Sequence, residues 1–182
     1  MKKFSILFIV ALAAFNSAHA QQAVNFTLCR DATFKDAQTG KKYVVIDCPG
    51  VSQQDLYNSF LMAAQYFTHV AHGEHHTDIE LIDHKSGFVI KNFGMGFSYS
   101  SGAPDNFTFS FMFQFKDGKV RIEAPIMPWE HTHMHLSYLN WHTKFDKDNQ
   151  WKKPEQLSVI DDAINSFLND IVKTALDTTQ AW

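Results

Sequence analysis

Three histidines alternate with other residues in the segment Trp129–His135. If this segment forms a strand, His131, His133 and His135 project from one face, because successive side chains of a strand point to opposite faces. Neutral imidazoles are ligands for zinc, copper and nickel, and three of them with one open coordination position are sufficient for a metal site. The spacing therefore makes these histidines candidate Zn, Cu or Ni ligands. The alternative is a surface segment in which histidine serves as a polar aromatic residue and no cofactor is bound.

A second histidine cluster occupies the segment His69–His76. Its members would share one helical face only if a helix continued past Gly73, and glycine at this point indicates a helix end. The H-x-E sequence of zinc deaminases occurs at His72–Glu74, but the P-C-x-x-C sequence that those enzymes also need is absent. A solvated helix end is the favoured interpretation, and a joint site formed by both clusters stays open.

Motifs for nucleophilic catalysis and nucleotide binding are incomplete. Gly96–Ser100 lacks the final glycine of G-x-S-x-G and falls within a strand pattern instead of a strand-to-helix turn. Gly94–Gly96 lacks the third glycine of a dinucleotide fingerprint, and no phosphate-binding P-loop motif occurs. The sequence thus identifies no catalytic residue, and we expect a protein that is not an enzyme.

The two cysteines, Cys29 and Cys48, suggest one disulfide in an oxidising compartment. Each lies near the end of a strand-like run, Val24–Arg30 and Tyr43–Cys48, and the turn-like Asp36–Lys42 separates the runs. A hairpin that closes there would bring the two cysteines nearly opposite. The alternative is a pair of separate buried thiols.

The chain begins with a segment typical of a secretory signal peptide. Lys2 and Lys3 precede the apolar run Phe4–Phe15, and Ala18–Ala20 has the A-x-A form of a cleavage site. We expect residues 1–20 to be removed and residues 21–182 to form one soluble periplasmic or secreted domain. Cys29 lies too far past the cleavage site for a lipoprotein, and no later run is long enough to span a membrane.

Charge restricts the classes of partner. Without Lys2 and Lys3, 14 basic residues remain against 19 acidic ones, so the exported chain has a net charge of −5 with histidine neutral. Nucleic-acid binding requires a basic face, so we exclude nucleic acid as a partner. A protein or a small molecule in the cell envelope is the partner that we expect.

The strongest structural pattern is the segment Asn106–Met127. Phenylalanine occupies every second position from 107 to 115, which is the period of a strand with one buried face. The following Asp117-Gly118 suits a two-residue type I′ hairpin turn. A turn at this point predicts four apolar cross-strand pairs on the same face, which are Phe115/Val120, Phe113/Ile122, Phe111/Ala124 and Phe109/Ile126.

Two helices are expected to cover this face. Ser52 and Asp55 form a capping-box variant, and an apolar stripe follows at helical spacing: Leu56, Phe60, Ala63, Ala64 and Phe67. Pro154 opens the second helix, whose stripe consists of Leu157, Ile160, Ile164, Phe167, Ile171 and Ala175. The expected order is strand, strand, helix, four strands, helix, with a His- and aromatic-rich excursion at 128–149. This order predicts an α+β fold in which a curved antiparallel sheet carries two helices on one face.

The chain resembles the exported bacterial family known as the "domain of unknown function with a TBP-like fold". Three segments carry the resemblance: Val51–Tyr57, Asp83–Gly96 with its Ser86-Gly87 turn, and Phe115–Arg121. It covers Cys48–Met127 and, more loosely, the final helix. The resemblance implies a TBP-like (β)-β-α-β-β-β-β-α order and an exported location. It supplies no activity and no catalytic residue, and Pro128–Asn149 departs from the family pattern.

Three functional hypotheses follow. The first is an exported, non-catalytic binding or interaction domain, because a locally consistent fold occurs beside incomplete catalytic motifs. The second is a metal-binding protein that uses His131, His133 and His135. The third is a carrier of a small apolar ligand in a cavity lined by the alternating phenylalanines, against the alternative that these rings fill a packed core.

Overall fold

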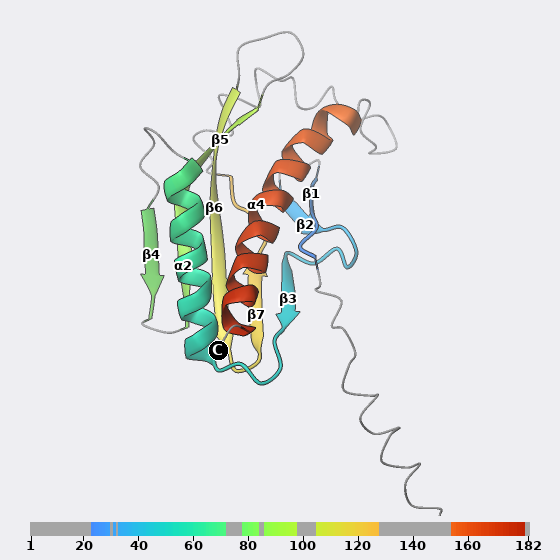
Figure 1. Cartoon of the computed structure of the whole chain (residues 1–182). Helices are drawn as coiled ribbons and strands as arrows, with labels where there is room; N and C mark the ends of the chain where they lie inside the picture. The colour runs from blue at the N-terminus through green and yellow to red at the C-terminus, as the bar shows by residue number, and fades with distance from the viewer. Residues whose placement is uncertain are drawn as a thin grey trace, which may run out of the picture.

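The structure, a computed structural model, describes residues 23–29, 31, 33–71, 78–83, 86–97, 105–127 and 154–180. Seven strands and two helices lie in this part of the chain (Figure 1). In chain order they are β1 (Phe26–Leu28), β2 (Phe34–Asp36), β3 (Tyr43–Asp47), α2 (Gln53–Ala71), β4 (Asp78–Ile82), β5 (Gly87–Phe97), β6 (Asp105–Lys116), β7 (Lys119–Glu123) and α4 (Pro154–Gln180). The expected signal segment 1–20 and the excursion 128–149 lie outside the described residues and stay predictions.

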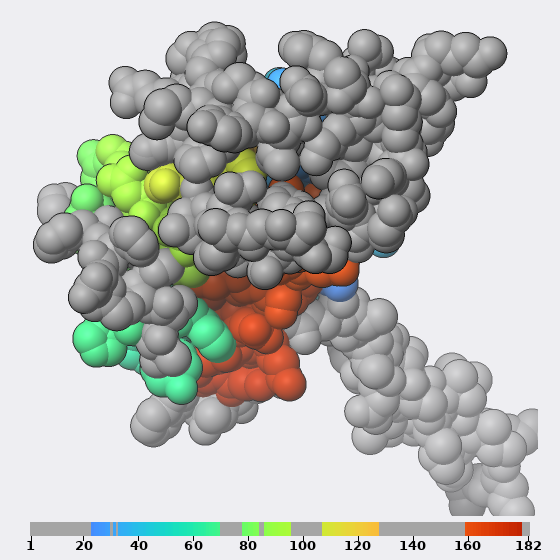
Figure 2. Space-filling model, turned by 90° about the horizontal axis from the view of Figure 1, so that it is seen from above, coloured from blue at the N-terminus to red at the C-terminus, as the bar shows by residue number. Residues whose placement is uncertain are grey.

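The strands form two antiparallel sheets. The larger sheet has the order β3-β7-β6-β5-β4, and β1 pairs with β2 in a separate two-stranded sheet. Both helices lie on the same face of the larger sheet (Figure 1), and α2 and α4 lie side by side when the molecule is seen from above (Figure 2). The expected α+β class, with a curved sheet and two helices on one face, is confirmed.

The alternating phenylalanines of β6 form the centre of the core. All five rings from Phe107 to Phe115 are buried. The ring of Phe60 on α2 lies 5.5 Å from that of Phe115, and the ring of Phe167 on α4 lies 5.1 Å from that of Phe111. Each helix therefore packs an aromatic ring onto this face of β6, and the burial of these side chains supplies much of the hydrophobic driving force for folding.

The apolar stripes predicted for the helices are buried where their side chains are described, except that Phe67 is only partly buried. Leu56, Phe60 and Ala64 of α2 are fully buried, as are Ile164 and Ile171 of α4. At the start of α2 the Asp55 N–H donates to Ser52 Oγ at 3.2 Å, and Ser52 Oγ donates to Asp55 Oδ2 at 2.6 Å. The predicted cap is therefore present at the N-terminus of α2, where it satisfies part of the hydrogen bonding of the first-turn N–H groups.

The register of the β6–β7 hairpin is confirmed near the turn and wrong beyond it. Phe115 pairs with Val120 and Phe113 pairs with Ile122, as predicted. Further along, Ile126 bridges Ser110 instead of Phe109. Pro125 explains the shift, because it has no N–H to donate to a ladder. The side chain of Ile126 is consequently 57% exposed, and Pro125 is buried in its place.

The hairpin turn also differs from its predicted type. A type I′ turn requires positive φ at both central residues, but only Gly118 has it, at 69°. Positive φ at the second central position alone is the requirement of a type II turn. The turn packs against the start of α2, where Gly118 N donates to Val51 O at 2.9 Å and Gln53 N donates to Asp117 Oδ1 at 2.8 Å. The turn in its observed geometry is thus hydrogen-bonded to the start of α2.

Strand β5 contains a bulge at Lys91–Asn92. The pairing with β6 shifts by one residue between Ile90 and Phe93, and Asn92 has a φ of 56°. Asparagine tolerates this left-handed conformation better than most residues. Because the shift adds one residue, Ile90 and Phe93 are both buried.

Both predicted N-terminal runs contain strands, β1 and β3, but the pairing predicted for them is wrong. A strand that was not predicted, β2, ends at Asp36, the first residue of the predicted turn Asp36–Lys42. It pairs with β1 and places Phe26 opposite Asp36. Strand β3 instead pairs with β7, with Val44 opposite Ile122. The hairpin proposed between Val24–Arg30 and Tyr43–Cys48 is therefore not formed, and three strands precede α2 instead of two.

Candidate functional site

The outer face of the larger sheet, opposite the helices, is hollowed over β3, β7 and β6. The hollow has a volume of about 460 Å³ and is lined by Val45, Ser86, Gln114, Phe115, Lys116, Lys119 and Arg121. It lies on the far side of the sheet from the buried phenylalanine rings, because Arg121 and Gln114 alternate with the buried Ile122 and Phe115 along their strands.

The pairing of the strands explains which lining residues are neighbours. Arg121 is the cross-strand partner of both Val45 and Gln114, which forms one row across the face. One step nearer the turn, Lys119 is the partner of Lys116. Residues opposite each other in antiparallel strands have Cβ atoms about 5 Å apart, so three cationic side chains start from one small area.

Gly87 continues the first row beside Gln114. A Cβ atom added to Gly87 would lie 2.3 Å from the backbone oxygen of Phe113, so a larger residue does not fit without a shift of the sheet. The adjoining Phe115 N–H donates to Ser86 O at 2.8 Å and fixes this wall of the hollow to β6.

Arg121 is held by two neighbours. Its guanidinium carbon lies 3.9 Å from the centre of the Tyr43 ring, and its Nε lies 2.6 Å from Glu123 Oε1. Stacking on an aromatic face combined with an ion pair restricts the rotamers of a long side chain. The guanidinium is therefore pre-positioned on the sheet face.

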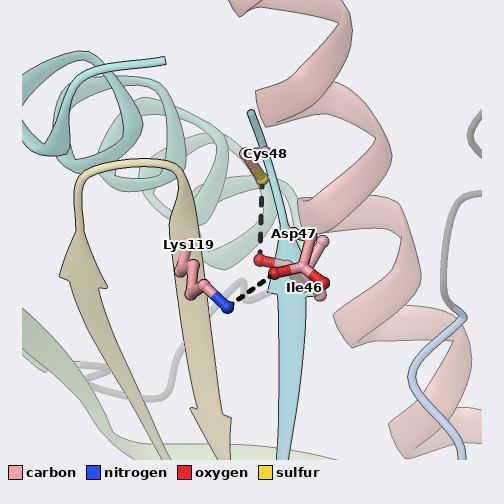
Figure 3. A network of polar contacts seen from close by, with 4 residues as sticks. All are labelled: Ile46, Asp47, Cys48 and Lys119. Carbon is pink, nitrogen blue, oxygen red and sulfur yellow. Dashed lines mark hydrogen bonds and ion pairs between the residues drawn. The ribbon is translucent and has the colours of Figure 1, made fainter. Parts of the chain in front are cut away.

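The two lysines of the hollow differ in their partners. Lys119 Nζ reaches across from β7 to Asp47 Oδ1 at 3.0 Å (Figure 3). Lys116 forms no ion pair with any acidic residue in the part of the chain that the structure describes. The exposed Lys91 on β5 pairs with Glu80 of β4. Lys116 therefore carries a positive charge that its described surroundings leave uncompensated.

The two cysteines are free thiols, so the predicted disulfide is corrected. Cys29 follows β1 and Cys48 follows β3, and these strands belong to different sheets. Burial, with a smaller contribution from Asp47, raises the pKa of Cys48 to about 11, and its Sγ lies 3.8 Å from the Ile46 oxygen (Figure 3). Burial also raises the pKa of Cys29. Thiols with raised pKa values are poor nucleophiles at neutral pH.

A polar ladder that the sequence did not predict joins α4 to β1. Asn165 Oδ1 accepts from Phe26 N at 2.7 Å, and Asn165 Nδ2 donates to Phe26 O at 2.8 Å. Asn169 makes the same pair of bonds to Val24, both at 2.9 Å. Helix α4 runs beside β1 (Figure 1), and its two amide side chains thus take the place of a neighbouring strand at the edge of β1.

Asp161 forms the third rung of the ladder. Its Oδ1 accepts from Leu28 N at 3.0 Å and its Oδ2 accepts from Thr27 Oγ1 at 2.9 Å. Burial raises the pKa of this carboxyl, against the opposing effect of the two hydrogen bonds, and the charge of Asp162 raises it further. The repeat of four residues on the helix matches alternate residues on the strand, because four helical residues and two strand residues both rise by about 6 Å. This spacing of Asp and Asn was the available sequence signal.

The histidines predicted as metal ligands are not placed by the structure. His131, His133 and His135 lie outside the described residues, as do His72 and the other histidines of its cluster that follow it. His69 is described and is exposed near the end of α2. Across the described ranges, no three His, Cys, Asp or Glu side chains form a group that could hold a metal ion.

The aromatic face bears on the apolar-carrier hypothesis. The rings of Phe88 and Phe113 stack at 4.9 Å, and those of Phe93 and Phe167 stack at 4.1 Å. These ring-to-ring contacts favour a packed core over a ligand cavity. Neither α2 nor α4, the helices in the described part of the chain, is long and apolar enough to cross a membrane.

Comparison with known proteins adds one structural likeness. No protein-family model and no curated protein matches the chain. The fold is similar to the crystal structure of a DUF4468 family protein from Bacteroides ovatus ATCC 8483, with 14% sequence identity and a TM-score of 0.46. The match covers 74% of this chain and 84% of that one. That family is a bacterial domain of unknown function.

Proposed function

We propose that this chain is an exported, non-catalytic binding domain whose ligand or partner in the bacterial cell envelope contacts the outer face of the sheet. The hollow at Arg121 is the observation that carries this proposal. The two described helices lie on the opposite face (Figure 1), and within the described part of the chain no helix lies on the outer face. The proposal that the chain is itself exported is supported by the signal-like segment 1–20.

The chemistry of the hollow supports binding. Its lining combines the apolar side chain of Val45 with a few polar groups, which is the usual composition of a small-molecule or peptide-side-chain site. Arg121 and Gln114 are among the residues that can orient a ligand by directed hydrogen bonds. The raised pKa values of Cys29 and Cys48 give neither thiol the character of an activated nucleophile.

Retention experiments with envelope extracts test the binding face. Immobilised protein with Lys116→Gln and Arg121→Gln should lose an envelope component that the unaltered protein retains. Lys91→Gln is the matched control, because Lys91 is an exposed lysine that does not line the hollow. Equal retention by all three proteins would contradict the proposed face. Turnover of an envelope substrate that depends on a defined residue cluster would contradict the non-catalytic role.

Fractionation of cells that express residues 1–182 tests export. The expected product is found outside the cytoplasm and begins at Gln21, as determined by mass spectrometry. A chain that keeps residues 1–20 and stays in the cytoplasm would overturn this part of the proposal.

A further inference from the structure

The charge of the residues that line the hollow indicates which charge its ligand carries. Lys116, Lys119 and Arg121 line it, and no acidic residue does. Asp47 and Glu123 pair with two of these cations from outside the lining. The local balance of these five groups is therefore one positive charge. A ligand group with a single negative charge neutralises this local charge.

Arg121 supplies the geometric part of the argument. Tyr43 covers one face of its guanidinium, and Glu123 engages its Nε. One face and the Nε of the guanidinium are thereby used to hold the side chain, and its Nη groups remain as donors for a ligand. A planar guanidinium matches the two oxygens of a carboxylate, and a pre-positioned one loses little entropy on binding.

We propose, resting on the proposed binding face, that the hollow binds the carboxylate of a small organic ligand. The Arg121 Nη groups donate to the carboxylate oxygens, and Lys116, which has no acidic partner among the described residues, supplies the uncompensated charge. The Gln114 amide and the Val45 side chain contact the uncharged part of the ligand. A volume of about 460 Å³ suits a molecule of short-peptide size.

Titration of the full exported chain with two blocked peptides tests this inference. The probes are acetyl-trialanine with a free carboxylate and the same peptide with a C-terminal amide, followed by NMR of the backbone and arginine side-chain N–H groups. The acid should shift the signals of Arg121, Lys116 and Gln114 with a Kd on the order of 1 mM, and the amide should bind at least roughly tenfold more weakly. Measurable binding of the amide with an affinity equal to that of the acid, or shifts elsewhere only, would overturn the carboxylate assignment.

A third probe identifies the source of the carboxylate. Acetyl-Ala-Glu-Ala-amide carries the charge on a side chain instead of the chain end. If it shifts the same signals and the chain-end acid does not, the ligand is a side-chain carboxylate, and the reverse result identifies a chain terminus; both outcomes support the proposal. Failure of both acids overturns it.

Three variants separate recognition from folding. Arg121→Gln should weaken acid binding by roughly tenfold or more, and Arg121→Lys should restore only part of it, because lysine keeps the charge but loses the planar fork. Lys91→Gln should bind as the unaltered protein does. Each variant is first checked for an unchanged far-UV spectrum and melting temperature. If Arg121→Lys binds fully, charge alone suffices and the directed role of the guanidinium is wrong.

The outcomes distinguish this inference from the proposed function. Loss of envelope retention in the Lys116/Arg121 variant, combined with no response to any acid probe, would leave the binding face standing and remove the carboxylate. Unchanged retention in that variant, combined with selective binding of acids, would remove the face as the site of partner contact.

Discussion

The side-chain amide of Asn165 bonds both backbone groups of Phe26, at 2.7 Å to its N–H and 2.8 Å to its carbonyl oxygen. A residue of the last helix thus completes the hydrogen bonding of the first strand. Asn169 repeats the arrangement at Val24, so the helix supplies a row of amides where another strand would otherwise lie. The two ends of the described chain are joined by this ladder, in which both asparagine rungs bind backbone groups of the strand segment.

Removal of the Asn165 amide should destabilise the fold. Asn165→Ala leaves the N–H and carbonyl of Phe26 without partners, and we expect a loss of about 2–4 kcal/mol in the free energy of unfolding. Urea denaturation measures it. Ser166→Ala, an exposed neighbour on the same helix, is the control and should change stability by less than about 0.5 kcal/mol. A loss for Asn165→Ala as small as that of the control would show that the ladder does not stabilise the N-terminal sheet.

The raised pKa of Asp161 predicts how stability depends on pH. Burial, partly opposed by the bonds from Thr27 and Leu28, holds this pKa above its ordinary 3.8. The folded state therefore binds the proton more tightly than the unfolded state does. The contribution of this group to stability is complete below pH 3.8 and is lost as pH rises through the folded pKa.

Comparison with Asp161→Asn isolates this effect. The stability of the unaltered protein relative to the variant should increase as the pH falls from about 7 toward about 4, because the variant has no group to titrate at this site. Urea midpoints across this range provide the measurement, and Asp170→Asn, at an exposed position of α4, is the control. A difference that is constant, or that shrinks toward acid, would contradict the assigned direction.

The docking of the hairpin turn onto α2 can be tested at Asp117. Its carboxylate accepts from Gln53 N at 2.8 Å, so a residue 64 positions away in sequence caps the helix. Asp117→Ala should cost about 0.5–2 kcal/mol in the free energy of unfolding, as is usual for the loss of a cap. Gln65→Ala, on the exposed face of α2, should be close to neutral. Thermal or urea unfolding of the two variants and the unaltered protein measures both differences in the free energy of unfolding.

The two free thiols predict slow chemical modification. With the pKa of Cys48 raised to about 11, little thiolate is present at neutral pH, and its side chain is buried. A thiol reagent should label Cys48 far more slowly in the native protein than in denaturant. In denaturant without reductant, both cysteines should be labelled, as free thiols are. An exported protein that resists labelling under those conditions would contain a disulfide after all.

The histidine triad stays a prediction that metal analysis can test. His131, His133 and His135 predict that purified, untagged protein binds Zn, Cu or Ni at roughly one ion per chain. His133→Gln should lower this content, whereas substitution of the exposed His69 should not. Protein that carries no stoichiometric zinc, copper or nickel after incubation with each metal would remove the hypothesis.

Local patterns in the sequence determined the elements and their buried faces. Alternation from Phe107 to Phe115 and helical spacing from Leu56 to Ala64 predicted which side chains are buried. The register at Phe113 and Ile122 also followed from the sequence, since the turn that sets it is only four residues away in each direction. These features depend on neighbours within one or two turns of the chain, which is the range over which hydrophobic periodicity is informative.

Tertiary structure alone decided how those elements are joined. The sequence could not show that β1 pairs with β2 and hydrogen-bonds to Asn165, or that β3 pairs with β7, because each partner is chosen by hydrogen bonds between distant segments. It equally could not show that Lys116, Lys119 and Arg121 line one hollow. Alternation identifies the polar face of each strand, but only the strand order places polar faces beside each other, and a binding site is made from that adjacency.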